Sequence, residues 1–197
     1  MLAASRIFVC GAHSVGKTTL VNELEKSSLL NYKRVPEVAR RIIEELGWTR
    51  NDFDLSTNRD NFKKLNTAIL HEYRKVLDEY KLQNAIFDRG PDALIYIRYY
   101  LSEEEYQEAI QLANVRYCIE SFRKGAIFIL EPCKEFIVDD SVRLVSTIDE
   151  LWAYTKLMYK TLDELGIAYQ VISEKDLTKR VQIVCEHVAA DGNDNCL

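Results

Sequence analysis

The chain has 197 residues, of which 47% are hydrophobic and 29% are charged. This composition is typical of one globular domain with a sizeable core and excludes a disordered chain. The 26 basic and 31 acidic residues give a net charge of −5, which disfavours general binding to nucleic acid or to a membrane surface.

Short apolar runs alternate with amphipathic segments along the chain. The apolar runs predict strands at 7–10, 31–35, 84–88, 126–130 and 167–172. Three- and four-residue spacing of apolar residues predicts helices at 17–26, 37–48, 59–83, 92–101, 103–123, 147–165 and 174–190. Polar segments remain, and we expect a mobile loop at 49–58, a mixed stretch at 133–146 and a disordered tail at 191–197. This alternation predicts a single α/β domain over 1–190, a doubly wound parallel sheet with helices on both faces.

Cysteine usage and the N-terminus bear on the compartment. The five cysteines are scattered and form no C-x-x-C pair, so they indicate neither a zinc site nor a disulfide framework. The N-terminal apolar run stops at Arg6, and no apolar segment approaches the ~20 residues that span a bilayer. We therefore expect no signal peptide, no membrane span and a reducing, cytoplasmic location.

The first predicted strand leads directly into a phosphate-binding sequence. Residues 11–18 read GAHSVGKT and fit G-x-x-x-x-G-K-[ST] between a strand and a helix. Its glycines let the backbone turn and point N–H groups at a polyphosphate, next to the positive end of the helix dipole. We expect an exposed Lys17 to bind the β- and γ-phosphates and Thr18 to bind Mg²⁺. The predicted nucleotide-binding set is Gly11, Ala12, His13, Ser14, Val15, Gly16, Lys17, Thr18 and Thr19.

Other interpretations of this loop explain less. A glycine-rich turn that only connects a strand to a helix would not need the Lys-Thr pair that follows the second glycine. His13 lies in the variable part of the motif, which favours a role in loop shape or solvation over a catalytic one.

Polar residues follow the other strands, where ligands of parallel sheets bind. Asp88 follows the third strand and is the candidate Mg²⁺ ligand, directly or through water, although it can also cap the next helix. Arg89 can stabilise a phosphate by paired hydrogen bonds, or lie at the surface paired with a carboxylate. Glu37 follows the second strand as a candidate base or contact for a substrate hydroxyl, with a plain helix-start carboxylate as the alternative.

Arginines and tyrosines nearby are further candidates. Arg40 lies one helical turn after Glu37 and is a candidate substrate contact, unless it is solvated. Arg143 is a candidate catalytic residue that closes over the phosphates of ATP, with a solvated loop position as the alternative. Tyrosines within 96–100 can stack on a base, but their helical spacing favours the core.

Four motifs together carry a resemblance to a known family. They are GAHSVGKT at 11–18, VPEVAR at 35–40, FDRG at 87–90 and FILEP at 128–132, with a later Asp139 and Arg143. This set resembles the AAA-type ATPase and kinase family grouped with the nicotinamide-riboside-kinase domain of bacterial NAD regulators. It is more distantly similar to nucleoside and nucleotide kinases.

The resemblance covers residues 5–172 and implies a P-loop NTPase fold with a five-stranded sheet of order 2-3-1-4-5. It implies Glu37 near the phosphoryl acceptor, Asp88 near Mg²⁺, Arg89 near the transferred phosphate and a lid at about 133–146. We therefore predict an enzyme that transfers a phosphoryl group from Mg-ATP to a nucleoside- or nucleotide-like small molecule. The acceptor, the choice of ATP or GTP, and the oligomeric state are left open.

Of two alternative functions, the first does not fit the sequence and the second fits part of it. A GTPase switch needs D-x-x-G and N-K-x-D, but Pro91 and the SEKD at 173–176 do not match these patterns. A nucleotide-binding regulatory protein with slow hydrolysis is the alternative, because 133–146 offers only Lys134 and Arg143 to hold phosphates.

Overall fold

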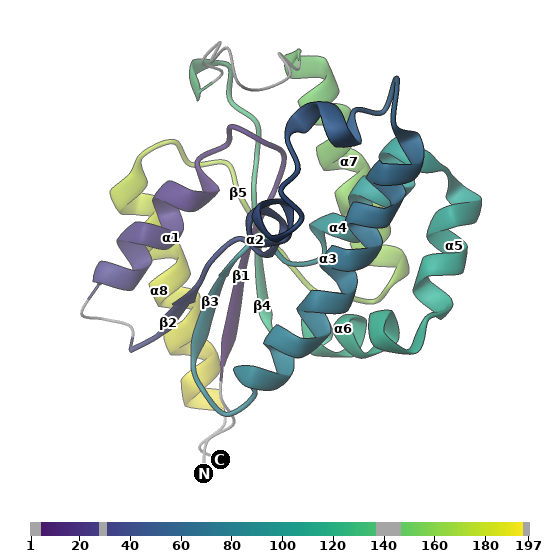
Figure 1. The fold of residues 1–197 in the computed structure, drawn as a ribbon. Coiled ribbons are helices and arrows are strands. Elements are labelled where there is room, and N and C mark those ends of the chain that lie inside the picture. Colours follow the sequence, from purple (N-terminus) through teal and green to yellow (C-terminus); the bar gives the residue numbers. More distant parts are fainter. Residues whose placement is uncertain (1–4, 28–30, 137–146, 195–197) are drawn as a thin grey trace.

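The computed structural model describes residues 5–27, 31–136 and 147–194 of the chain, with side chains to residue 190. Five strands form one parallel sheet in the order β2-β3-β1-β4-β5, as expected (Figure 1). The strands are β1 (Arg6–Cys10), β2 (Lys33–Val35), β3 (Ala85–Asp88), β4 (Ala126–Leu130) and β5 (Gln170–Ile172). The predicted fold class and strand order are therefore confirmed.

Helices cover both faces of this sheet. Figure 1 shows α1 (Lys17–Lys26) beside α8 (Leu177–Asp194) on one face. The other face carries α3 (Arg59–Glu79), α4 (Asp92–Tyr96), α6 (Ala113–Arg123) and α7 (Ile148–Glu164), with α5 (Glu103–Gln111) outside them. The short α2 (Val38–Glu45) packs against α3 near the carboxyl end of β2. No helix of the described residues is long and apolar enough to cross a membrane.

The three central strands, β1, β3 and β4, are buried because they are almost wholly apolar. Phe8 of β1 lies at the centre, where its ring stacks on Phe87 of β3 at 4.6 Å between centroids. The Phe122 ring of α6 meets the Phe8 ring edge-on, at 5.1 Å between centroids. This packing fixes β1 against β3 and brings the carboxyl ends of the two strands together.

Three segments differ from the sequence expectation. The loop expected at 49–58 contains a 3₁₀ helix (Arg50–Phe53) that begins with a capping box, in which Thr49 N donates to Asp52 Oδ2 at 2.7 Å. The helix expected at 92–101 changes after α4 into a π-helical turn (Ile97–Leu101). Extended backbone at Leu112 divides the single helix expected at 103–123 into α5 and α6, so that each helix buries its own apolar face.

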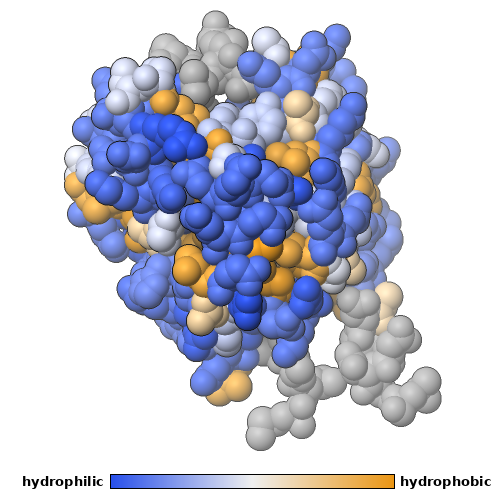
Figure 2. Space-filling view, turned by 90° about the vertical axis from the view of Figure 1, so that its right-hand side faces the viewer, coloured by the Kyte–Doolittle hydropathy of each residue, from blue (hydrophilic) through white to orange (hydrophobic). Residues whose placement is uncertain are grey.

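Smaller differences concern helix ends and the surface. α3 ends at Glu79, before the predicted end at 83, and α8 continues to Asp194, beyond the predicted end at 190. The face shown in Figure 2 is largely hydrophilic, with apolar patches between the charged regions, as is normal for a folded domain.

Candidate active site

The phosphate loop joins β1 to α1 at the carboxyl edge of the sheet. Gly11 and Gly16 have φ values of +134° and +91°, which favour glycine. A Cβ atom at Gly11 would lie 2.6 Å from the carbonyl oxygen of Leu130 in β4. The first glycine is therefore required both by the backbone conformation and by the close approach of the neighbouring strand.

The Lys17 side chain lies inside this loop and is only 5% exposed, so the expectation of an exposed lysine was wrong. Its Nζ atom donates to the carbonyl oxygen of Gly11 at 2.9 Å and to that of Ala12. Burial, and to a smaller extent the nearby Arg89 guanidinium, lower the pKa of Lys17 to about 7, although the surrounding carboxylates act in the opposite direction. A bound polyphosphate would supply the negative charge that stabilises this ammonium group.

Thr18, in the first turn of α1, pairs with Asp88, the last residue of β3. The Thr18 hydroxyl donates to Asp88 Oδ2 at 2.6 Å. Asp88 is 3% exposed, and its other oxygen, Oδ1, is buried with no hydrogen-bond partner among the described residues. A hydroxyl beside a carboxylate with a spare oxygen suits Mg²⁺, which usually takes one or two protein ligands and completes its shell with phosphates and water.

Arg89 follows β3 and is held by two carboxylates. Its Nε donates to Glu37 Oε1 at 2.7 Å, and its Nη1 donates to Asp92 Oδ1 at 3.2 Å. The φ of Arg89 is +85°, a conformation that costs a non-glycine residue ~1–2 kcal/mol. Asp92 Oδ2 also accepts the Gly90 N–H at 3.0 Å, which stabilises this turn.

Glu37 precedes α2 and remains ionised in this arrangement. Burial raises the pKa of its carboxyl group, but the charge and hydrogen bond of Arg89 outweigh burial and lower the pKa below its ordinary value. An ionised carboxylate beside a guanidinium can accept a hydrogen bond from a substrate hydroxyl and later its proton.

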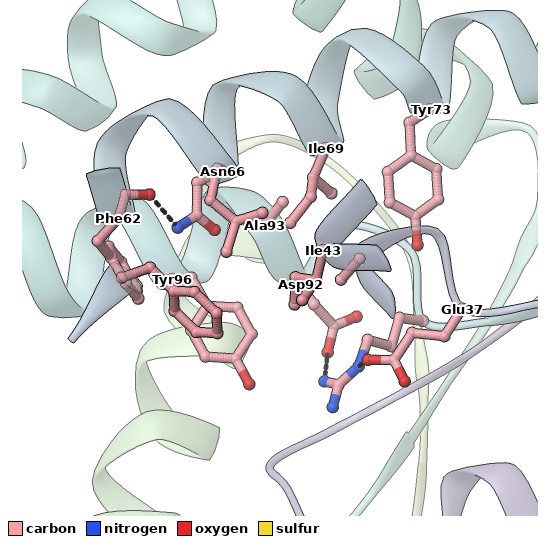
Figure 3. A pocket seen from close by; sticks show the side chains of 13 residues that line it. Glu37, Ile43, Phe62, Asn66, Ile69, Tyr73, Asp92, Ala93 and Tyr96 are labelled. Carbon is pink, nitrogen blue, oxygen red and sulfur yellow. Dashed lines mark hydrogen bonds and ion pairs between the residues drawn. The ribbon is translucent and has the colours of Figure 1, made fainter. Parts of the chain in front are cut away.

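A cavity of about 200 Å³ opens beside Glu37 and Arg89 (Figure 3). Its walls come from α2, the 3₁₀ helix Arg50–Phe53, α3 and the start of α4. The polar end consists of Glu37, Arg89 and Asp92, and most of the remaining wall is apolar or aromatic. The cavity therefore adjoins the strand edge that carries the phosphate loop.

A family comparison decides the classification. A family model described as an AAA domain matches residues 6–180, which is most of the chain. The chain belongs to this AAA domain family. A search of curated protein sequences finds no match.

Solved structures with a similar fold include two small-molecule kinases and NadR. Shikimate kinase from Acinetobacter baumannii in complex with shikimate has 17% identity and a TM-score of 0.60, covering 95% of this chain and 94% of that one. Deoxyadenosine kinase from M. mycoides, with products dCMP and a flexible dCDP bound, has 15% identity and a TM-score of 0.69, covering 94% and 99%. NadR in complex with NR has 21% identity and a TM-score of 0.69; the match covers 93% of this chain and 51% of NadR. At these identities the likeness shows the fold, and this chain spans about half of NadR.

The structure of this AAA domain separates the remaining candidates. Arg40 does not line the cavity, and its side chain is 67% exposed with Nη2 3.8 Å from Glu37 Oε2. Arg143 and most of the expected lid lie outside the described residues. Tyr96 lines the cavity, whereas Tyr99 packs on Tyr154 at 5.7 Å, within the aromatic cluster next to the core.

Two charged residues near the site were missed from the sequence. Asp92 opens α4 and orients Arg89; its place three residues after an arginine is a signal that could have identified it. Arg180 of α8 is 3% exposed and donates from Nη1 to the carbonyl oxygen of Val15 at 2.9 Å. Its distance along the chain from the phosphate loop leaves no sequence signal for that contact.

Proposed function

We propose that this protein is a phosphotransferase that moves the γ-phosphoryl group of Mg-ATP to a nucleoside- or nucleotide-like small molecule. One observation carries the proposal: the phosphate loop with its Thr18–Asp88 pair and the cavity at Glu37 and Arg89 share one sheet edge. A donor site and an acceptor site so close together favour in-line transfer between two bound molecules.

Each residue has a defined part in this proposal. The Lys17 ammonium group and the loop N–H groups hold the β- and γ-phosphates, while Thr18 and Asp88 hold Mg²⁺, which neutralises phosphate charge. The acceptor oxygen bonds to the γ-phosphorus as the bond to the β,γ-bridging oxygen breaks, and ADP leaves. Glu37 takes the proton of the acceptor hydroxyl, and Arg89 stabilises the charge on the transferred group.

One observation favours the alternative of a nucleotide-binding regulatory protein with slow hydrolysis. The cations beside the phosphate loop, Lys17, Arg89 and Arg180, are already hydrogen-bonded to protein oxygens. In that alternative the three cations keep these protein partners when nucleotide binds. They then do little to stabilise the negative charge on the γ-phosphoryl group as its bond to ADP breaks.

Incubation with γ-labelled ATP, Mg²⁺ and a panel of nucleosides and nucleotides distinguishes the two functions. The proposal expects a labelled small-molecule product whose formation depends on one acceptor class. Slow release of labelled phosphate, at a rate that no acceptor changes, would instead support the regulatory alternative.

A further inference from the structure

We propose that the acceptor is a compact, ring-bearing alcohol without a phosphate or carboxylate group, and that the Asn66 amide binds an edge of its ring. The inference rests on the proposed phosphotransfer and narrows its acceptor from nucleoside- or nucleotide-like to nucleoside-like. Three properties of the cavity carry it: charge, size and one buried amide.

The charge of the cavity disfavours an anionic acceptor. Its charged lining residues are two carboxylates, Glu37 and Asp92, and one guanidinium, Arg89, which pairs with both at 2.7 and 3.2 Å. An entering phosphate or carboxylate would have to compete with both carboxylates for Arg89, which the transferred phosphoryl group also needs. Since an unpaired charge is costly in a buried site, the described lining favours a neutral or cationic acceptor.

The size and walls of the cavity favour a small ring. Its volume of about 200 Å³ lies below the ~300–1,000 Å³ of common ligand pockets. Figure 3 shows Phe62 and Tyr96 at one end, with Ile43 and Ile69 between that end and Glu37. A flat ring that binds between these side chains would place its hydroxyl-bearing part next to Glu37.

Asn66 supplies the polar contact within the apolar wall. The residue is 3% exposed, and among described residues its side chain makes one hydrogen bond, from Nδ2 to the Phe62 carbonyl oxygen at 2.9 Å. In Figure 3 the amide extends from α3 toward Ala93, on the cavity side. One N–H and the amide oxygen are left as a donor–acceptor pair, which matches the edge of a heterocycle or carboxamide.

Matched acceptor pairs test the charge argument. Steady-state ADP formation is measured with nucleosides, with their 5′-monophosphates and with shikimate. We expect each accepted nucleoside to have a KM at least about tenfold below that of its monophosphate, and shikimate to be inactive. Equal or better use of a monophosphate or of shikimate would overturn this inference and leave the proposed transfer standing. Absence of product from every acceptor, with Mg-ATP still bound in calorimetry, would overturn both.

A pair of neighbouring variants tests the amide. Asn66→Leu keeps the side-chain volume and removes the donor–acceptor pair, so the acceptor KM should rise about tenfold or more while the ATP KM is unchanged. Thr67→Ala is the matched control, because Thr67 also bonds the carbonyl four residues earlier, at 2.9 Å, but faces away from this cavity. Circular dichroism confirms that both variants fold. An unchanged acceptor KM in folded Asn66→Leu would overturn the role of Asn66.

Discussion

The two halves of the site are built in different ways. The phosphate-binding part of the donor half is one continuous segment, residues 11–18, whose shape comes from backbone turns at Gly11 and Gly16. The acceptor half is a cavity formed by side chains between Glu37 and Tyr96, from helices that meet only after folding. A loop whose shape is set by its own backbone can form in many structural contexts, whereas a packed cavity keeps its shape only if every lining side chain stays in place. Substitutions in the donor half should therefore remove binding outright, and those in the acceptor half should change rate and selectivity.

Lys17→Met gives the largest expected effect on the binding of Mg-ATP. It removes the ammonium group from the phosphate loop and keeps an apolar side chain of similar length in the buried space. We expect kcat/KM for ATP to fall by at least ~10²–10³-fold, because a preorganised donor to the phosphates is lost. Calorimetric titration with Mg-ATP measures the binding, and thermal unfolding checks the fold. A folded variant that binds Mg-ATP like the wild type would contradict the assignment of the donor half.

Glu37→Gln should come next, and it acts on the acceptor half. Loss of the proton acceptor should slow transfer ~10²–10⁴-fold while ATP binding changes little. Glu44→Gln on the exposed side of α2 is the matched control and should transfer at the wild-type rate. Unchanged turnover in Glu37→Gln would reduce Glu37 to a partner of Arg89.

Asp92→Asn tests how the arginine of the acceptor half is held. The substitution keeps the shape but weakens the bond to Arg89 Nη1 and the bond from the Gly90 N–H. We expect kcat to fall ~10-fold with a smaller change in acceptor KM, and stability to fall by ~1–3 kcal/mol. Steady-state kinetics and denaturant unfolding measure the two effects. A loss of stability without a loss of kcat would make Asp92 a purely structural residue.

The contrast between a local loop and a cavity formed by packing also explains which features the sequence could predict. The phosphate loop, the five strands and the placement of Asp88 follow from local patterns, because a run of apolar residues or a glycine pair acts on its own neighbourhood. The burial of Lys17, the bond of Arg180 to Val15 and the cavity contact of Asn66 depend on which segments pack together. The break at Leu112 could not be predicted for the same reason, because α5 and α6 are separate helices that each bury their own apolar face.

Proton uptake on nucleotide binding is the smallest effect, and it tests the charge of Lys17 in the donor half. Burial holds the pKa of Lys17 at about 7 in the free protein, so the amine is mostly neutral at pH 8 and mostly protonated at pH 6. A polyphosphate favours the ammonium form, so binding should take up most of a proton at pH 8 and little at pH 6. By the same linkage, affinity should fall about fivefold between pH 7 and pH 8. Calorimetry in buffers of different ionisation enthalpy measures the uptake, which Lys17→Met should abolish, and a binding enthalpy at pH 8 that is independent of the buffer would refute the lowered pKa.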